Sequence, residues 1–335
     1  MTILKNKKIE YRLPLDVGIL YMKYLNYFAI SLFCILGICS FCYLVKIYQY
    51  SNPICSQNIS YASEVPEHPF FSIVMTTYNR EEYLKRSICS ALAQTYDNFE
   101  LVIIDDGSKD MSARLIKAFQ KKDKRIVFIQ NDKNRGISFN RNRLIDIAKG
   151  EYITTLDSDD SFLPELLAET KSYIDKNPQT DLVHGYIVSM EDNGFFNIEN
   201  IWGSAWLESI FIINAIQNTG TSYRRQFVLD HKIRYDEKYM NAEDYLFWAQ
   251  MIINGAKVGM IKKVLAAFRL HHTNSKEYYS KMKQNDYKVK KILREHFSTA
   301  SSLNYCLLYR NLTEEAKQYF SKEHLETIRN TYCFE

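Results

Sequence analysis

The chain has 335 residues, of which 46% are hydrophobic and 24% are charged, so it is long enough to bury a sizeable core. Its formal net charge of +4 is small and dispersed, which argues against a nucleic-acid partner. Glycine and proline are scarce, at 11 and 6 residues, and we find no internal repeat, which argues against disorder and low complexity.

The first predicted element is a transmembrane anchor at residues 24–45. No residue between Lys23 and Lys46 carries a charge, and at about 1.5 Å per residue the segment would span roughly 33 Å, enough to cross a bilayer core. A buried core helix is the alternative, although such helices seldom run this long without a charge. A cleaved signal peptide fits less well, because the apolar run is too long and no small-residue cleavage site follows it.

The charges on the two sides of this anchor predict its orientation. The tail at residues 1–23 is rich in lysine and arginine, whereas on the other side only Lys46 is basic before Arg80. Because basic residues stay cytoplasmic, we expect a single-pass type II membrane protein with a signal-anchor, whose large C-terminal part is lumenal, in the Golgi apparatus or endoplasmic reticulum. Sequons at Asn58 and Asn311 fit that compartment.

Beyond the anchor, the sequence predicts a stem at residues 46–68 and a globular domain at residues 69–275. In the domain, short apolar runs alternate with amphipathic segments. The predicted order is strand 71–75, helix 80–94, strand 101–104, helix 112–121, strand 126–130, helix 138–148 and strand 151–156. This alternation is typical of βαβ units, so we expect an α/β fold with a mainly parallel sheet flanked by helices. Residues 276–335, rich in lysine and tyrosine, are predicted to form a C-terminal helical extension.

Polar residues follow three of the predicted strands, at 76–80, 105–108 and 157–160. Ligands of parallel sheets bind beyond the carboxyl ends of the strands, so these three clusters should converge. The glycine fingerprint for dinucleotides and the phosphate-binding Gly-Lys-Ser/Thr loop are both absent. A bound phosphate must therefore be neutralised in another way.

The last cluster contains three aspartates, Asp157, Asp159 and Asp160. Each raises the cost of ionising the others, and a hard divalent cation such as Mg²⁺ or Mn²⁺ would relieve this repulsion while it bridges to a diphosphate. The alternative is that these residues cap a helix after Pro164 or lie in an ordinary loop.

Two stretches of the sequence together resemble a known family. They read FSIVMTTYNREEYLKRSICSALAQTYDNFELVIIDDGSKD and NRGISFNRNRLIDIAKGEYITTLDSDD. They are similar to the nucleotide-sugar half of family 2 glycosyltransferases, which have the GT-A fold. The resemblance runs nearly unbroken from Phe71 to Pro164 and resumes more weakly at NAEDYLFWAQMIINGAKV and FRLHHTNS, so about half the chain is covered.

The resemblance implies roles for residues on the donor side. Thr76, Tyr78 and Asp106 would hold the uracil and ribose of a UDP-type donor, with Tyr78 as the aromatic face and Asp106 accepting from the base. Arg141 would contact the nucleotide or its phosphates, which suits its fixed cationic fork. A solvated position on a helix is the alternative for Arg141.

The same resemblance implies a metal site and a base. Asp159 would contact the metal directly, and Asp157 would reach the ribose or a water on the metal. His271 or His272 would close over the diphosphate or the metal, with the register open between them. Asp244 would be the base that takes the proton of the acceptor hydroxyl, although acidic residues at a helix start also suit the helix dipole.

The implied function is metal-dependent, inverting transfer of one hexosyl or N-acetylhexosaminyl unit from a UDP-type nucleotide sugar to a hydroxyl of a glycan, lipid or protein. The Gln-x-x-Arg-Trp segment of processive synthases is absent, which favours transfer of a single sugar. The alternatives are a nucleotidyltransferase, which would release pyrophosphate instead of UDP, and a pseudoenzyme that binds sugar nucleotide or glycan. The sequence leaves open the sugar, the acceptor, the disulfide pairing and the oligomeric state.

Overall fold

The computed structural model of the protein describes residues 59–191, 196–202, 214–270 and 276–298. The predicted tail, the anchor at 24–45 and most of the stem lie outside these residues. In the described part of the chain, no helix is both long and apolar enough to cross a bilayer. The anchor therefore stays a prediction.

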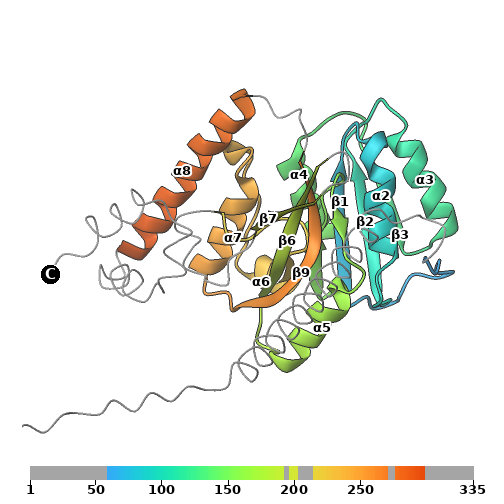
Figure 1. The fold of residues 1–335 in the computed structure, drawn as a ribbon, viewed down its shortest axis with the longest axis horizontal. Coiled ribbons are helices and arrows are strands. Elements are labelled where there is room, and N and C mark those ends of the chain that lie inside the picture. The colour runs from blue at the N-terminus through green and yellow to red at the C-terminus, as the bar shows by residue number, and fades with distance from the viewer. Residues whose placement is uncertain (1–58, 192–195, 203–213, 271–275, 299–335) are drawn as a thin grey trace, which may run out of the picture. The chain divides into compact units, whose positions relative to one another are not determined.

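Helices and strands alternate through the first half of the described chain (Figure 1). In order, the elements are β1 Phe71–Thr77, α2 Glu81–Leu92, β2 Phe99–Asp105, α3 Ser112–Lys122, β3 Ile126–Gln130, α4 Ile137–Ile147, β4 Tyr152–Thr155, β5 Ser161–Phe162, α5 Leu166–Lys176, β6 Leu182–Glu191, β7 Phe196–Trp202, β8 Ser222–Arg224, α6 Arg225–Asp230, the 3₁₀ helix η2 Glu237–Tyr239, α7 Glu243–Ile253, β9 Val258–Leu270 and α8 Lys276–Ser298. The four strands and three helices predicted between residues 71 and 156 are confirmed, with ends that differ by a few residues.

The strands lie in one sheet in the order β3-β2-β1-β4-β8-β6-β9-β5, with β7 paired to β6. The predicted parallel pairing is confirmed for β1 to β4, where each crossover contains a helix. Beyond β4 the sheet is mixed, because β8 is antiparallel to both β4 and β6, and β5 is antiparallel to β9. After Pro164, β6 and β7 form an antiparallel pair of consecutive strands, whereas β6 and β9 are parallel. The helices α6 and α7 and the 3₁₀ helix η2 lie between β8 and β9.

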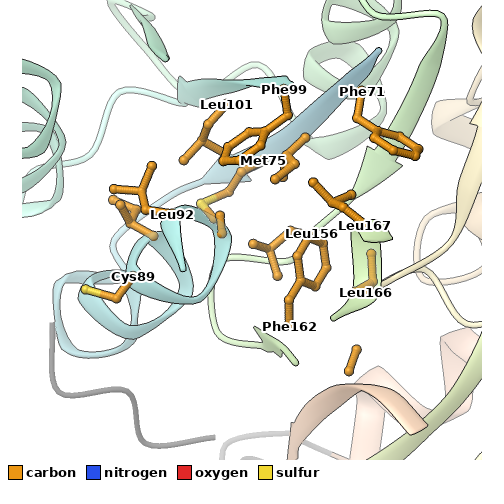
Figure 2. Packing of buried hydrophobic residues seen from close by; sticks show 14 of the residues in the cluster. Phe71, Met75, Cys89, Leu92, Phe99, Leu101, Leu156, Phe162, Leu166 and Leu167 are labelled. Carbon is orange, nitrogen blue, oxygen red and sulfur yellow. The ribbon is translucent and has the colours of Figure 1, made fainter. Parts of the chain in front are cut away.

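Helices cover both faces of the sheet because the strands are apolar on both sides. Alternate residues of β1 separate the two cores: Phe71 and Met75 pack in the core beneath α2, α3 and α5, whereas Val74 packs in the core beneath α4, α6, α7 and α8. Figure 2 shows the first core, in which Leu156 and Phe162 lie near Leu166 and Leu167 of α5. Leu156 and Phe162 flank the acidic loop, which we define as residues 157–160. Both ends of the acidic loop are thereby fixed by apolar burial.

A close contact sets where β4 enters the sheet. A Cβ added to Gly150 would lie 2.4 Å from the backbone nitrogen of Ser72, so no side chain fits there. The Gly150 N–H donates to Ser72 Oγ at 2.8 Å, and that hydroxyl donates to Glu100 Oε1 at 2.6 Å. Because β4 leads directly into the acidic loop, this contact between β4, β1 and β2 helps to position the candidate site.

Candidate functional site

The three polar clusters predicted to converge do lie together. β2, β1 and β4 are parallel neighbours, so the segments that follow Asp105, Thr77 and Thr155 leave the same edge of the sheet. The site is therefore built on loops at the carboxyl ends of these strands.

The loops after β1 and β2 are locked together by hydrogen bonds. The Asn79 N–H donates to Ser108 Oγ at 2.9 Å, and the Lys109 N–H donates to Asn79 Oδ1 at 2.8 Å. Asn79 adopts a left-handed conformation with φ of 51°, which asparagine tolerates better than most residues. Beside it, Tyr78 keeps 42% of its surface exposed, so an aromatic face is presented on a loop of fixed shape.

Asp106 is buried, and its carboxylate fixes the loop that leads to α4. It accepts from Asn131 Nδ2 at 2.8 Å, from the Arg135 N–H at 2.8 Å and from the Gly136 N–H at 2.9 Å. A carboxylate has about four acceptor positions, so these three bonds leave room for one more donor. The contact with a base that the sequence implies for Asp106 stays a prediction.

Thr76 lies at the floor of the site. It lines a cavity of about 10 Å³ together with Arg141, Asp157 and Asn218. Such a space holds about one water molecule and is too small for a nucleotide. The predicted contact of Thr76 with uracil or ribose is not tested by this geometry.

The aspartates after β4 have different partners. Asp157 Oδ1 accepts from Arg141 Nη2 and from Asn218 Nδ2, both at 2.9 Å. Asp159 Oδ2 lies 3.4 Å from Arg80 Nε, and its side chain is 20% exposed. Both carboxylates therefore border the open part of the site, each beside an arginine.

Asp160 differs because it is buried and structural. It accepts from the Thr219 hydroxyl and, at 2.9 Å, from the Arg269 backbone N–H of β9. Burial, followed by the charges of Asp159 and Asp157, raises the pKa of Asp160 well above its ordinary value. The Asp160 carboxylate thus joins the acidic loop to β9, and Arg269 Nε adds a bond to the Asp159 carbonyl at 3.2 Å.

Arg141 is buried between two carboxylates. Its Nη1 donates to Glu243 Oε1 at 2.8 Å, its Nη2 donates to Asp157, and the guanidinium lies 5.4 Å from the centre of the Tyr235 ring. Burial alone would lower the pKa of Arg141, but Asp157 and Glu243 outweigh it and raise the pKa. The alternative of a solvated helix residue is wrong, whereas contact with a nucleotide stays a prediction.

The Glu243-Asp244 pair opens helix α7, as the sequence predicts. Glu243 is buried against Arg141, while Asp244 keeps part of its surface exposed and accepts from Asn214 Nδ2 at 3.0 Å. Burial, followed by the charge of Glu243, raises the pKa of Asp244 to about 6, against the opposing effects of Arg141 and Asn214. The carboxylate is still mostly ionised at neutral pH and is a stronger base than an ordinary aspartate.

Sequence reasoning missed several residues of the site. Asn214 and Asn218 hold Asp244 and Asp157, and both come from the segment before β8. Thr219 joins the same segment to Asp160, and Arg80 approaches Asp159 from the loop after β1. The sequence NTGTSYRRQF predicts a strand beside the acceptor site, but nothing in it indicates which side chains reach the carboxylates.

The residues present suit a divalent cation. Asp157 and Asp159 offer oxygen ligands two positions apart on one loop, and Asp157 Oδ2 accepts no hydrogen bond from the described residues. Mg²⁺ typically takes one or two carboxylates and completes its shell with phosphate oxygens and water. No group of three or more such ligands occurs among the described residues, and His271 and His272 lie outside them.

Comparison with other sequences agrees with this geometry. Residues 72–241 match the family model described as glycosyl transferase family 2. An uncharacterized glycosyltransferase of Methanocaldococcus jannaschii is 34% identical over 223 residues, which are 65% of this chain and 76% of that protein. One from Haemophilus influenzae is 29% identical over 241 residues, 69% of this chain and 74% of that protein.

Solved structures show a similar fold. Residues 1–349 of TarS from S. aureus, in complex with UDP-GlcNAc, superpose with a TM-score of 0.54 at 20% identity, covering 74% of this chain and 77% of that one. The mannosyltransferase PcManGT from Pyrobaculum calidifontis, in complex with GDP-Man and Mn²⁺, gives a TM-score of 0.50 at 10% identity, with 89% and 96% covered.

The bonds of Asp106 make a prediction about the loop at residues 131–136. Asp106→Ala should increase hydrogen exchange at the Arg135 and Gly136 amides, because a bond to a buried carboxylate contributes about 1.5–3 kcal/mol. Asp132→Ala is the control, since Asp132 is an exposed carboxylate of the same loop. Equal protection of both amides in the Asp106 variant and in the wild type would contradict this role.

Proposed function

Because the chain belongs to glycosyltransferase family 2, we propose that it transfers one sugar from a UDP-type nucleotide sugar to a hydroxyl of a glycan, lipid or protein, with a divalent cation and with inversion. One observation carries the proposal: the acidic loop after β4 and the candidate base on α7 are joined in a single site through Arg141. A cation-binding loop and a base within one site are what such a transfer needs.

The donor side supports a uridine nucleotide. Tyr78 offers an exposed aromatic face for a base, and Asp106 keeps one acceptor position for a base N–H. The structural neighbour TarS was solved with UDP-GlcNAc, which favours an N-acetylhexosaminyl donor within this proposal. We place the nucleotide above Thr76, between the loops after β1 and β2.

On the diphosphate side, Asp159 and Asp157 would hold Mn²⁺ or Mg²⁺, which would stabilise the leaving diphosphate when bound. His271 remains a proposed third ligand. Arg80, half-exposed beside Asp159, adds a fixed positive charge near the same place. No protein acid is then required at the leaving group.

On the acceptor side, Asp244 takes the proton of the acceptor hydroxyl. The acceptor oxygen forms its bond to the anomeric carbon as the bond from that carbon to the diphosphate oxygen breaks, with attack from the opposite face. The bonding pair leaves with the diphosphate, and the proton ends on Asp244. The surroundings of Asp244 raise its pKa toward neutrality, which strengthens it for this task.

We also propose that the domain is anchored in a membrane as a single-pass type II protein, with the domain on the lumenal side. The uncharged segment at residues 24–45 and the basic tail before it support this topology. Cys89 is disulfide-bonded, and disulfides persist in oxidising compartments.

The Asp159 and Asp244 variants should lose activity for different reasons. Asp159→Ala should abolish metal-dependent binding of the donor, whereas Asp244→Asn should bind the donor normally and lose transfer by about 100-fold or more. Acceptor-dependent UDP release from a panel of nucleotide sugars measures transfer, and calorimetry with and without Mn²⁺ measures binding. EDTA should stop release in the wild type. Normal transfer by Asp244→Asn would reject Asp244 as the base, and pyrophosphate as the product would reject the reaction.

The pKa of Asp244 predicts the pH profile. A base must be deprotonated, so kcat/KM should be flat above about pH 7 and should fall about tenfold per unit below about pH 5, with a midpoint at about 6. An aspartate with the ordinary pKa of 3.8 would keep the rate nearly flat down to about pH 5. UDP release in a constant-ionic-strength buffer series measures the profile, and a flat acid limb would show that Asp244 is not the group that titrates.

The topology can be measured in sealed membrane vesicles. For the full chain, externally added protease should remove an epitope on the N-terminal tail and leave the domain intact until detergent opens the vesicles. A soluble cytoplasmic protein added outside serves as the digestion control. Digestion of the domain in intact vesicles would reverse the proposed orientation.

A further inference from the structure

The donor side and the acceptor side of the site are connected twice. One connection is ionic: Asp157 accepts from Arg141 at 2.9 Å, and Arg141 donates to Glu243 at 2.8 Å. Glu243 is followed directly by Asp244 in the first turn of α7. A helix turn is rigid, so the position of Glu243 sets the position of Asp244.

The second connection runs through two asparagines. Asn218 Nδ2 donates to Asp157 at 2.9 Å, and Asn214 Nδ2 donates to Asp244 at 3.0 Å. The chain between them is itself held, because Gln217 Nε2 donates to the Asn214 carbonyl at 3.3 Å. Asp157 and Asp244 are therefore the common ends of both connections.

The structure assigns these residues to one closed ring that fixes the separation between the diphosphate-side carboxylate and the base, an inference that rests on the proposed role of Asp244. The members of this carboxylate ring are Asp157, Arg141, Glu243, Asp244, Asn214 and Asn218. Arg141, Glu243 and the two asparagines are positioning residues, since they act through the carboxylates.

Unpaired atoms in the ring support a role beyond packing. The carboxylates force each amide nitrogen toward them, which leaves Asn214 Oδ1 and Asn218 Oδ1 buried with no partner among the described residues, and the same holds for Glu243 Oε2. Buried acceptors without a partner cost stability. Residues selected for stability alone would give these atoms hydrogen-bond partners. Residues selected to orient a carboxylate can instead leave them unpaired, at a cost in stability.

The ring has a direct consequence for mutants. Asn214 and Asn218 belong to the same connection in series, so breaking it at either place releases the same constraint and a second break adds little. The ionic connection runs in parallel with it, so a variant that weakens both connections should lose much more than the product of the two single effects. If the contacts were independent, the loss of activity in a double variant would equal the product of the two single losses.

The pH profile separates positioning from folding. Among the described residues, the charged groups that act on Asp244 are Glu243 and Arg141, and Asn214 donates a hydrogen bond to its carboxylate. Asn214→Ala removes that bond and should move the midpoint of kcat/KM upward. Asn218→Ala does not touch Asp244 and should leave the midpoint in place, so it is the matched control for this readout.

The decisive experiment is a set of double-mutant cycles on the full chain. At pH 8, where Asp244 is ionised in all variants, Asn214→Ala and Asn218→Ala should each lower kcat by about 10-fold, with UDP affinity changed less than about twofold. Their combination should also lose about 10-fold, where independent sites would lose about 100-fold. The double variant of Asn218→Ala and the conservative Glu243→Gln should lose more kcat than the product of the two single losses. The double variant of Asn218→Ala and the remote Asn177→Ala should lose kcat by the product of its single losses.

The outcomes distinguish failure of the carboxylate ring from failure of the proposed function. Multiplicative losses for the two asparagines, in a wild type that transfers sugar, would overturn the ring and leave the proposed function standing. The same cycle measured on urea unfolding needs no catalysis. Coupling between the asparagines there, with no transfer from any nucleotide sugar, would retain the ring and reject the function, whereas additive unfolding energies would reject the ring.

Discussion

The buried guanidinium of Arg141 is the interaction on which the site depends. Taking the Arg141 guanidinium and the Glu243 carboxylate out of water is costly, and the cost is offset only when the charges pair with good geometry. Here both terminal nitrogens of Arg141 bond to carboxylates, Asp157 from the loop after β4 and Glu243 from α7. Arg141 therefore holds together two segments whose carboxylates are 86 positions apart in the sequence, and loss of either carboxylate would leave one terminal nitrogen of the buried guanidinium without its partner.

This constraint also separates the three aspartates that the sequence presents as one cluster. Their spacing predicts mutual repulsion relieved by a cation, but the fold distributes them among protein partners. Asp157 pairs with Arg141, Asp159 lies beside Arg80, and Asp160 is buried against Thr219 and the backbone of β9. The extent of burial, which no local pattern specifies, distinguishes the two candidate metal ligands, Asp157 and Asp159, from the structural residue Asp160.

Local sequence patterns are enough to predict the first half of the domain, in which neighbouring strands follow one another closely along the chain. Apolar runs and helical periodicity between residues 71 and 156 predicted the elements, and the parallel pairing of β1, β2 and β4 brought their polar ends together as expected. Asn214 and Asn218 could not be predicted, because their partners lie 30 and 61 positions away and are set by the antiparallel return of β8. The raised pKa of Asp244 could not be predicted either, because it arises from burial beside Glu243.

A residue that resembles a ligand contact can also stabilise the structure before any ligand binds. Asp106 follows β2 in the Asp-Asp-Gly-Ser segment, and the resemblance assigns it to the base of a nucleotide. In the structure its oxygens hold Asn131 and the amides of Arg135 and Gly136, so the loop is formed before any ligand binds. In the proposed function, a donor would bind to a loop that is already ordered by folding, and the remaining acceptor position of Asp106 would be oriented before the base binds. The same carboxylate thus serves the fold and, in the function proposed above, would serve the binding of a nucleotide through the shape that it fixes.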